Sequence, residues 1–371
     1  MKIGILTQPI RSNYGGILQN WALQQVLITL GHKPFTFRRY DGTKTYRIWR
    51  DLKSILSYIV KHLIFHRNRK YNKLPWDKAP YEHTEHFIQK NIKKITYYGI
   101  LRETDLLQKH IKLIIVGSDQ VWRPLYNKGI LSTMYCEFLP PDSDIKPITY
   151  AASFGVDTWE YSEEEGEMAK REIQKFKAIS VREQSGADIC LSKFNREAIK
   201  VLDPTLLIDV SIYSAITYPN VYTSLPKQYI GVYILDITTE KRAFVEKVSK
   251  VLGFEAIYFG NTLVDGKNLM PIERWLATIK NCSFMITDSF HGTVFSILFQ
   301  KEFLSIVNPE RGADRIFSLL ETFNLTKQIV DLNRNTDVES LLPNPICWSD
   351  INTILQAERQ KSLEFLKNNI S

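Results

Sequence analysis

The sequence predicts an α/β protein with two domains. Short apolar runs typical of buried strands alternate with segments of helical periodicity along most of the chain. The chain has 371 residues, and a single hydrophobic core usually organises fewer residues than that. Residues 211–227 carry two prolines and no periodicity, which predicts a linker. We therefore expect an N-terminal domain at 1–210, a C-terminal domain at 228–348, and a final helix at 349–371 that crosses back onto the first domain.

The first domain opens with a strand at 2–7, a glycine-containing turn at 12–16 and a helix that continues to Leu30. Gly31 follows that helix, at the position where a left-handed residue commonly ends one. Further strands of this domain are expected at 34–37, 112–116, 148–154, 178–181 and 200–209. In the second domain we expect strands at 229–235, 255–259, 284–287 and 303–306, with helices at 239–252, 271–281 and 312–323.

Residues 42–105 are predicted to form a mostly helical insertion with a basic start. Segment 38–73 holds eleven Lys and Arg and two Asp, a net charge of +9, although the whole chain carries only +8. An amphipathic helix is expected at 46–66, flanked by basic residues through 70; those on its sides are Arg47, Arg50, Lys53 and Lys61. Such a helix is suited to an anionic membrane surface. Packing of its apolar face on its own domain is the alternative, and both interpretations stay open.

Polar residues gather where the predicted strands end, the edge at which open α/β sheets bind ligands. The turn after strand 284–287 combines an acid, a hydroxyl, an imidazole and the start of a helix, whose amides favour an anion. Its candidate residues are Asp288, Ser289, His291, Gly292 and Thr293. The candidates of the first domain are Asn13, Tyr14, Gly15, Gly16, Ser118, Asp119, Gln120 and Arg182. Simple capping of the helix by Asp288 or Ser289 is the structural alternative.

Composition excludes several classes of protein. The four cysteines are scattered without a CxxC pair, so we expect neither disulfides nor a dedicated zinc site. The sequence contains no Walker-type loop, and we expect a reaction without metal or cofactor. No apolar run is long enough to span a bilayer and no signal peptide is recognisable, which predicts a cytoplasmic protein. The basic segment carries no motif for nucleic acid.

Six motifs, in order along the chain, resemble the polysaccharide pyruvyl transferase family. They are NYGGILQNWALQ from Asn13, GSDQVW from Gly117, YAASFG from Tyr150, SVRE from Ser180, VLDPT from Val201 and TDSFHGT from Thr287. The basic insertion at 42–105 lies outside this resemblance. The resemblance implies two Rossmann-like domains facing across a cleft, similar to the GT-B architecture of glycosyltransferases. It also implies transfer of the enolpyruvyl group of phosphoenolpyruvate to a sugar, as a cyclic ketal, with release of phosphate.

By the same resemblance, three residues hold the donor: Asp119, Arg182 and His291. The acceptor is expected to be a sugar of a surface polysaccharide or of its lipid-linked precursor, which places the protein at the inner face of the cell membrane. One branch of the family has an arginine two residues before the histidine, where this chain has Ser289. We take Arg311 or Arg315 as the replacement cation.

The chemistry of phosphoenolpyruvate suggests a role for each residue. Arg182, with Arg315, would clamp the carboxylate and phosphate, and the amides of Gly292 and Thr293 would add a dipole-based anion site. His291 would deliver a proton to the donor or to the leaving phosphate. Asp119 would act as the base for the acceptor hydroxyl or would orient His291, and the sequence leaves both open. This model requires Arg182 and His291 to share one cavity.

Two other functions remain open at this stage. One is a glycosyltransferase of the same architecture that uses a nucleotide-sugar donor. The other is a binding protein that uses the basic helix for docking and performs no chemistry.

Overall fold

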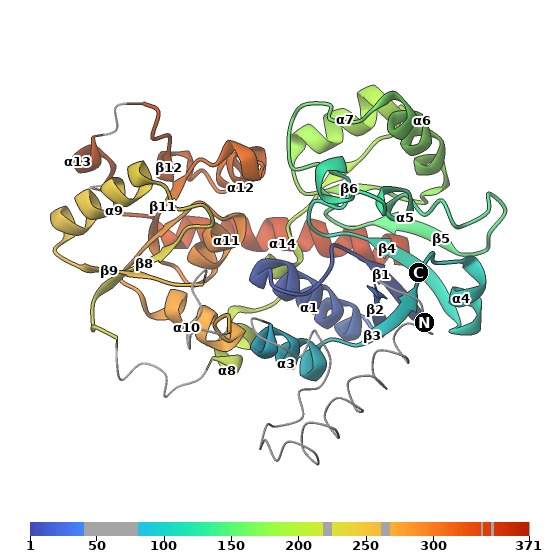
Figure 1. The fold of residues 1–371 in the computed structure, drawn as a ribbon, viewed down its shortest axis with the longest axis horizontal. Helices are drawn as coiled ribbons and strands as arrows, with labels where there is room; N and C mark the ends of the chain where they lie inside the picture. Colours follow the sequence, from blue (N-terminus) through green and yellow to red (C-terminus); the bar gives the residue numbers. More distant parts are fainter. Residues whose placement is uncertain (41–80, 218–224, 261–267, 335–336, 343–344, 371) are drawn as a thin grey trace, which may run out of the picture.

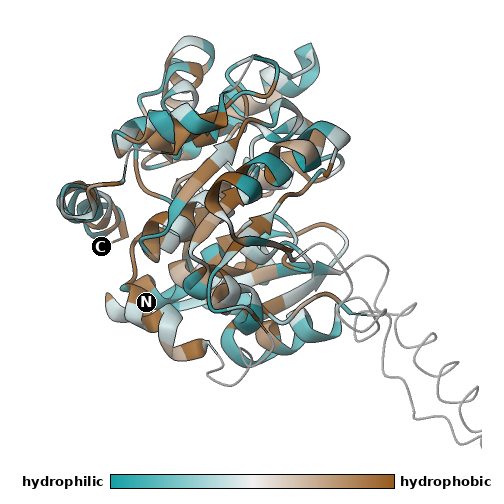
Figure 2. Ribbon diagram, turned by 90° about the vertical axis from the view of Figure 1, so that its left-hand side faces the viewer, coloured by the Kyte–Doolittle hydropathy of each residue, from teal (hydrophilic) through white to brown (hydrophobic). Residues whose placement is uncertain are grey.

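The computed structural model describes residues 1–40, 81–217, 225–260, 268–334, 337–342 and 345–370 (Figure 1). The amphipathic helix predicted at 46–66 lies outside these residues. Two parallel five-stranded sheets lie side by side, and helices pack around each of them (Figure 1). The apolar residues concentrate on the central strands and on the inner faces of the helices (Figure 2). No helix among the described residues has both the length and the hydropathy of a membrane span.

The N-terminal sheet is parallel throughout and has the order β3-β2-β1-β4-β5. Its strands are β1 (Lys2–Leu6), β2 (Lys33–Tyr40), β3 (Lys94–Tyr98), β4 (Ile111–Val116) and β5 (Lys146–Thr149). Two short strands, β6 (Ser180–Val181) and β7 (Ile199–Lys200), continue it through single bridges from Ile148 to Ala178 and from Ala152 to Val181. The resulting order is that of a Rossmann half.

The predicted helical insertion is wrong in its second part. Residues 94–98 form β3, which pairs with β2, so this segment belongs to the sheet. Two helices flank this strand, α3 (Glu82–Asn91) and α4 (Glu103–Gln108). β3 is an edge strand with half-buried side chains and the sequence KITYY, so it lacks the apolar run by which the central strands are recognised.

The remaining helices of the N-terminal half are α1 (Tyr14–Thr29), α5 (Leu131–Met134), α6 (Glu163–Glu172), α7 (Gln184–Phe194) and α8 (Val210–Ile216). As its sequence suggests, α6 begins at a capping box, in which Ser162 and Glu165 satisfy each other's backbone N–H groups. The strand expected at 200–209 is shorter than predicted. Its chain leaves the sheet after Lys200 and turns through a 3₁₀ helix at Pro204–Leu206, because Pro204 cannot donate to a ladder.

The C-terminal sheet has the order β12-β11-β10-β8-β9, again entirely parallel. Its strands are β8 (Tyr229–Tyr233), β9 (Glu255–Tyr258), β10 (Phe284–Thr287), β11 (Glu302–Ile306) and β12 (Ile329–Val330). Its helices are α9 (Thr239–Leu252), α10 (Ile272–Asn281), α11 (Phe290–Leu298), α12 (Asp314–Thr322) and α13 (Val338–Leu341). The strand order reverses direction once in each sheet, between β1 and β4 and between β8 and β10. Ligands of open α/β sheets bind at such reversals.

One hydrophobic core joins the two sheets. A single cluster of buried side chains includes Ile5 of β1, Trp21 of α1, Trp275 of α10 and Phe295 of α11. The ring of Tyr14, at the start of α1, stacks on Trp275 with a centroid distance of 5.5 Å, and its hydroxyl donates to the Met270 carbonyl at 2.9 Å. Because this interface is apolar and extensive, the two halves are held in one relative position.

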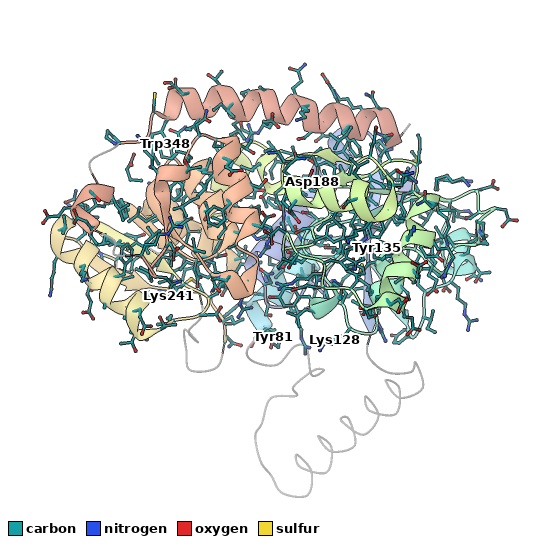
Figure 3. All side chains as sticks on the ribbon, turned by 90° about the horizontal axis from the view of Figure 1, so that it is seen from above. Tyr81, Lys128, Tyr135, Asp188, Lys241 and Trp348 are labelled. Carbon is teal, nitrogen blue, oxygen red and sulfur yellow. The ribbon has the colours of Figure 1, made fainter. Side chains whose placement is uncertain are left out.

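The long helix α14 (Trp348–Ile370) runs along both halves of the molecule (Figures 1 and 3). Near its start, Asn352 accepts from Gln300 of the C-terminal half at 3.3 Å. Further along, the Arg359 guanidinium donates to the Ile208 carbonyl at 3.0 Å, and the Ser362 hydroxyl accepts from the Leu202 amide at 3.0 Å. The helix therefore ties the second half to the segment that follows β7.

Because the core is shared, heat should unfold both halves in one cooperative transition. Trp275→Ala removes a fully buried ring at the interface and should lower the free energy of unfolding by about 3–5 kcal/mol. Leu191→Ala, at a side chain 57% exposed, is the control and should change it by less than about 0.5 kcal/mol. Calorimetry measures both. Two separate transitions in the wild-type protein would contradict a shared core.

Candidate functional site

A cleft of about 480 Å³ lies where the two strand-order reversals face each other. The loops after β1, β4, β8 and β10 line it, together with the segment that enters α12. Its polar side chains are Gln8, Ser12, Asn13, Asp119, Gln120, Ser289, His291, Arg311 and Arg315, and its aromatic side chains are Tyr14, Tyr126, Tyr233 and Phe290. The two sheets therefore bring most of the predicted site residues to one place.

His291 lies in the first turn of α11, which begins at the N-cap Ser289. Its ring packs directly on the first turn of α1. A Cβ atom added to Gly15 would lie 2.0 Å from His291 Nδ1, so only glycine allows this approach. The other ring nitrogen, Nε2, is buried and has no hydrogen-bond partner among the described residues. It lies 3.7 Å from Asp203 Oδ2.

Asp203 is the site residue that sequence reasoning missed. It is fully buried, and its Oδ2 accepts from Arg182 Nη1 at 2.9 Å and from the Ser118 hydroxyl at 3.1 Å. Its Oδ1 accepts from the Thr205 amide at 2.9 Å and from the Thr205 hydroxyl at 2.6 Å. Burial by itself raises the pKa of this carboxyl, but the nearby His291 imidazole, then the charge of Arg182, hold the pKa well below its usual range. The sequence signal that could have identified Asp203 is an acidic residue near the end of a predicted strand, directly before a proline.

Arg182, at the end of β6, is held by protein carboxylates. Its guanidinium is 2% exposed, lies 3.5 Å from Asp119 Oδ1, and stacks 4.3 Å above the Phe290 ring. Burial lowers the pKa of Arg182, but the charges of Asp203, Asp119 and Glu183 outweigh burial and raise it. Arg182 is thus permanently charged and neutralised by the protein itself.

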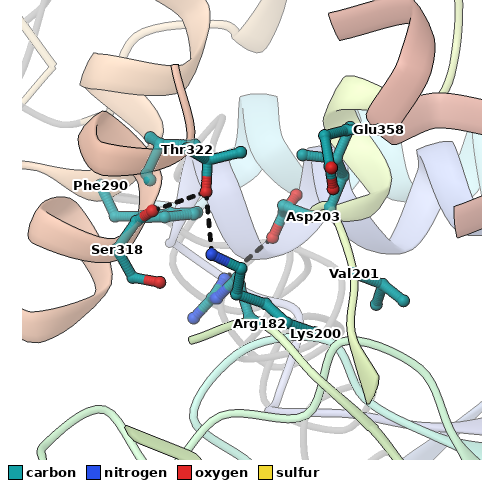
Figure 4. Close-up of a pocket in the computed structure, with 10 residues that line it drawn as sticks. Arg182, Lys200, Val201, Asp203, Phe290, Ser318, Thr322 and Glu358 are labelled. Carbon is teal, nitrogen blue, oxygen red and sulfur yellow. Dashed lines mark hydrogen bonds and ion pairs between the residues drawn. The ribbon is translucent and has the colours of Figure 1, made fainter. Parts of the chain in front are cut away.

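The expected shared cavity of Arg182 and His291 is not what the structure shows. Arg182 lines a separate, small cavity behind Phe290, shown in Figure 4. The other polar residues of this cavity are Lys200, Asp203, Ser318, Thr322 and Glu358. His291 lines the cleft on the other side. The two residues are connected through Asp203, which contacts both.

Two arginines line the cleft itself. Arg315 enters from the first turn of α12, with Nη1 3.6 Å from Asp119 Oδ1 and its guanidinium 5.6 Å from the Phe290 ring. Burial, followed by repulsion from Arg182, lowers the pKa of Arg315 to about 10. Arg311 stands nearer to solvent and makes two hydrogen bonds of 2.8 Å to Asp236. These bonds lower the pKa of Asp236 to about 2.

Three predicted residues have structural roles. Asp288 accepts from Lys241 Nζ at 2.7 Å and from the Leu235 amide at 2.6 Å, so it fixes the loop after β8 and does not line the cleft. Gly292 packs against β10, because an added Cβ would lie 2.2 Å from Thr287 Oγ1. The buried Thr293 hydroxyl forms hydrogen bonds with the Ser289 carbonyl and the Ser305 hydroxyl. The amides of Gly292 and Thr293 donate to Ser289 at 3.4 and 3.0 Å, so the anion site predicted on them is wrong.

The first turn of α1 offers amides in their place. Asn13 caps this helix by accepting from the Gly16 amide at 3.1 Å. The amides of Tyr14 and Gly15 are first-turn groups for which the helix itself provides no acceptor. Tyr14 lines the cleft and Gly15 lies against His291, so this helix end adds positive potential beside the imidazole.

Within the described ranges, no three His, Cys, Asp or Glu side chains lie close enough together to hold a metal ion. Metal independence stays a prediction from the sequence.

The model of the polysaccharide pyruvyl transferase family matches residues 13–310. The chain belongs to this family. The match includes the first turn of α1, Asp119, Asp203 and His291. Arg311 and Arg315 lie just beyond the matched residues.

No curated protein matches the sequence. Among solved structures, UDP-GlcNAc 2-epimerase from Neisseria meningitidis bound to UDP-GlcNAc has a TM-score of 0.51 and 7% identity, over 100% of this chain and 99% of that one. HepE from Anabaena in complex with UDP has a TM-score of 0.52 and 10% identity, over 99% and 100%. Similarity at this level concerns the fold. This family member therefore has two Rossmann-like halves in a GT-B-like arrangement, as expected.

Gly15→Ala should force α1 and His291 apart, because the new methyl group would overlap the imidazole. We expect a loss of about 1–3 kcal/mol in the free energy of unfolding, measured by urea denaturation. Gly16→Ala is the matched control, since its Cβ would lie 3.3 Å from the flexible Asn13 side chain. Equal effects of the two substitutions would show that the close approach is unimportant.

Asp203→Asn should lower the free energy of unfolding at pH 7 by about 3–5 kcal/mol, because it leaves the buried Arg182 undercompensated. The folded-state pKa of Asp203 is depressed, so its contribution is complete above its ordinary pKa of about 4 and is lost as pH falls below that value. The difference between the wild-type and variant stabilities should therefore narrow progressively as pH falls from about 5 toward about 1.

Urea denaturation across this pH range measures the convergence. Asp188→Asn, at an exposed carboxylate of α7, is the control and should change the free energy of unfolding by less than about 0.5 kcal/mol. A stability difference for Asp203→Asn that stays constant with pH would mean that its charge contributes nothing.

Proposed function

We propose that this protein transfers the enolpyruvyl group of phosphoenolpyruvate to a sugar and closes it into a pyruvate ketal, with release of phosphate. The observation that carries this proposal is the cleft wall shared by His291 and Arg315, in a member of the polysaccharide pyruvyl transferase family. The donor has two anionic groups and a carbon that must accept a proton. A guanidinium and an imidazole on one wall match these requirements.

Arg315 is our candidate for the main cation that binds phosphoenolpyruvate. Its planar fork can bind a carboxylate or phosphate through two hydrogen bonds, and its charge is already desolvated at the cleft wall. Arg311 is nearer the cleft mouth and is suited to a second anionic group once it leaves Asp236. The Tyr14 and Gly15 amides supply further donors. In this arrangement Arg315 replaces the cation that Ser289 does not provide.

His291 is proposed to protonate the methylene carbon of the donor. The new C–H bond forms as the ring N–H bond breaks, which leaves positive charge on the neighbouring carbon and its oxygen. A sugar hydroxyl attacks that carbon and loses its proton, which recharges the imidazole. Phosphate then leaves with its bonding electrons, and a second hydroxyl of the same sugar attacks to close the ketal. The proton released by this second hydroxyl accompanies the phosphate, so the reaction balances.

Asp119 is proposed to position the two arginines, Arg182 and Arg315. Its Oδ1 lies 3.5 Å from Arg182 and 3.6 Å from Arg315, and it also accepts from the Gln120 amide at 3.0 Å. A carboxylate so placed orients Arg315 toward the cleft and is engaged by two guanidinium groups. The carboxylate next to His291 is Asp203.

The acceptor is proposed to be a sugar of a surface polysaccharide or of its lipid-linked precursor. The basic segment at 46–70 would then bring the cleft to an anionic membrane surface at the inner face of the cell membrane. Membership of the family supports the acceptor, and the positive charge of the basic segment supports the membrane contact.

The proposal is tested by measuring phosphate release from phosphoenolpyruvate with a panel of free and lipid-linked glycans. His291→Gln should lower kcat by about 10²–10⁴-fold, because the proton donor is lost. Arg315→Gln should raise KM for phosphoenolpyruvate by about tenfold or more, because a charged contact to the donor is lost. Arg334→Gln, at a side chain 87% exposed, is the control and should leave both constants unchanged.

Nucleotide sugars serve as the competing ligands. Thermal stabilisation by a nucleotide sugar, with none by phosphoenolpyruvate and no phosphate release on any glycan, would overturn the proposal in favour of a glycosyltransferase.

A further inference from the structure

We propose that Asp203 is a positioning residue that holds the His291 imidazole with its Nε2–H toward the carboxylate, so that Nδ1 is the atom that exchanges protons with the ligand. This inference rests on the proposed function for the identity of the ligand, but not for the state of the ring. Two residues from opposite halves of the molecule would thus form one proton-transfer unit.

His291 Nε2 is buried next to a carboxylate. Its ion-pair partner is Asp203 Oδ2, at 3.7 Å. That separation slightly exceeds a hydrogen bond, and a small rotation of the ring would close it. Catalytic hydrogen bonds are often long in unliganded structures and shorten when charge develops. An unpaired buried nitrogen costs about 1–3 kcal/mol, which favours the closed arrangement.

Nδ1 lies on the other edge of the ring. This edge packs on the first turn of α1, where only glycine at position 15 leaves room for it. His291 also lines the cleft, together with Asn13 and Tyr14 of that turn. The ring therefore presents Nε2 to a buried carboxylate and has its Nδ1 edge on the helix start that lines the cleft.

The Asp203 carboxylate is held in one orientation. Thr205 fixes Oδ1 with two hydrogen bonds, and Ser118 and Arg182 fix Oδ2, so the group cannot rotate away from the ring. The pKa of Asp203 lies well below its usual range, although burial acts against this, so the group stays charged at neutral pH. A fixed, charged acceptor is what holds one tautomer in place.

The surroundings make this acceptor necessary. His291 lies at the N-terminus of α11 and against that of α1, and both helix ends disfavour a cation. The guanidinium groups of Arg182 and Arg315 lie nearby and act in the same direction, whereas Asp119 and Glu183 oppose them while already paired with Arg182. Asp203 is the carboxylate whose oxygen faces the ring itself. Without it the imidazolium needed for proton donation would be disfavoured.

The consequence is a defined proton path. The imidazolium donates its Nδ1 proton to the donor carbon, and the neutral ring keeps its Nε2 proton toward Asp203. The same Nδ1 lone pair then takes the proton of the attacking hydroxyl. The ring does not need to flip between these steps.

The experiment is nitrogen NMR of the full chain with ¹⁵N-labelled histidine, in which the spectrum of His291→Gln identifies the His291 signal among seven histidines. In the wild-type protein the neutral ring should be the Nε2–H tautomer. In Asp203→Asn the Nδ1–H tautomer should gain population, because the carboxylate that accepts from Nε2–H is lost. Thr205→Val, which releases the carboxylate without removing its charge, should cause a smaller shift in the same direction.

Kinetics supply a second measurement. Asp203→Asn should lower kcat while leaving KM for phosphoenolpyruvate within about threefold, since it does not line the cleft. A neutral Nδ1–H ring in the wild type, or a tautomer population unchanged in both variants, would overturn the inference. If Asp203→Asn does not fold, the wild-type tautomer and Thr205→Val still decide. Should phosphoenolpyruvate not react while the NMR results hold, the proposed function fails and the pairing stands.

Discussion

The contact between the first turns of α1 and α11 is the constraint on which the rest of the structure depends. Gly15 lets the backbone of one half lie against the imidazole of the other, and the Tyr14 ring stacks on Trp275 directly beside it. Each helix begins at a strand-order reversal of its own sheet. Joining these two helix ends therefore places the two ligand-binding edges opposite each other, and the cleft follows from that contact.

A second contact closes the far side of the cleft. Gly312 packs on the Gly155 carbonyl, which an added Cβ would approach to 2.1 Å, and the Gln184 amide of α7 donates to Ser318 of α12 at 3.3 Å. The first contact is apolar and extensive, whereas the second is polar and includes the ion pair of Arg315 with Asp119 and the hydrogen bond from Ser185 to Asp314. The two together set both walls of the site.

Electrostatics explains why the charged residues of the site are so precisely held. Burying a charge is costly unless it is paired, and here Arg182, Arg315, Asp119 and Asp203 compensate one another around the ring of Phe290. Arg182 is paired with three carboxylates in this network, those of Asp119, Glu183 and Asp203. Arg315 has the weaker pairing and a depressed pKa, so an anionic ligand would relieve its desolvation. Of the two arginines that line the cleft, Arg315 is thus the one whose charge the protein compensates less.

The sequence by itself determined the α/β class, the two runs of strands and helices, and the strand ends at which polar residues gather, because these depend on local periodicity and turn chemistry. It also identified His291, Asp119 and Arg315 as candidates, through their motifs or their place near a helix start. Local patterns failed for β3, since an edge strand needs no apolar run.

Only the tertiary structure decided which of these residues share a surface. Asp203 became a partner of His291 because α11 of one half packs over the turn that follows β7 of the other. The same packing turned Arg182 inward, behind Phe290, and left Arg315 at the cleft. Such pairings join residues far apart in the chain, and they follow from how two completed sheets dock. No periodicity within either half carries that information.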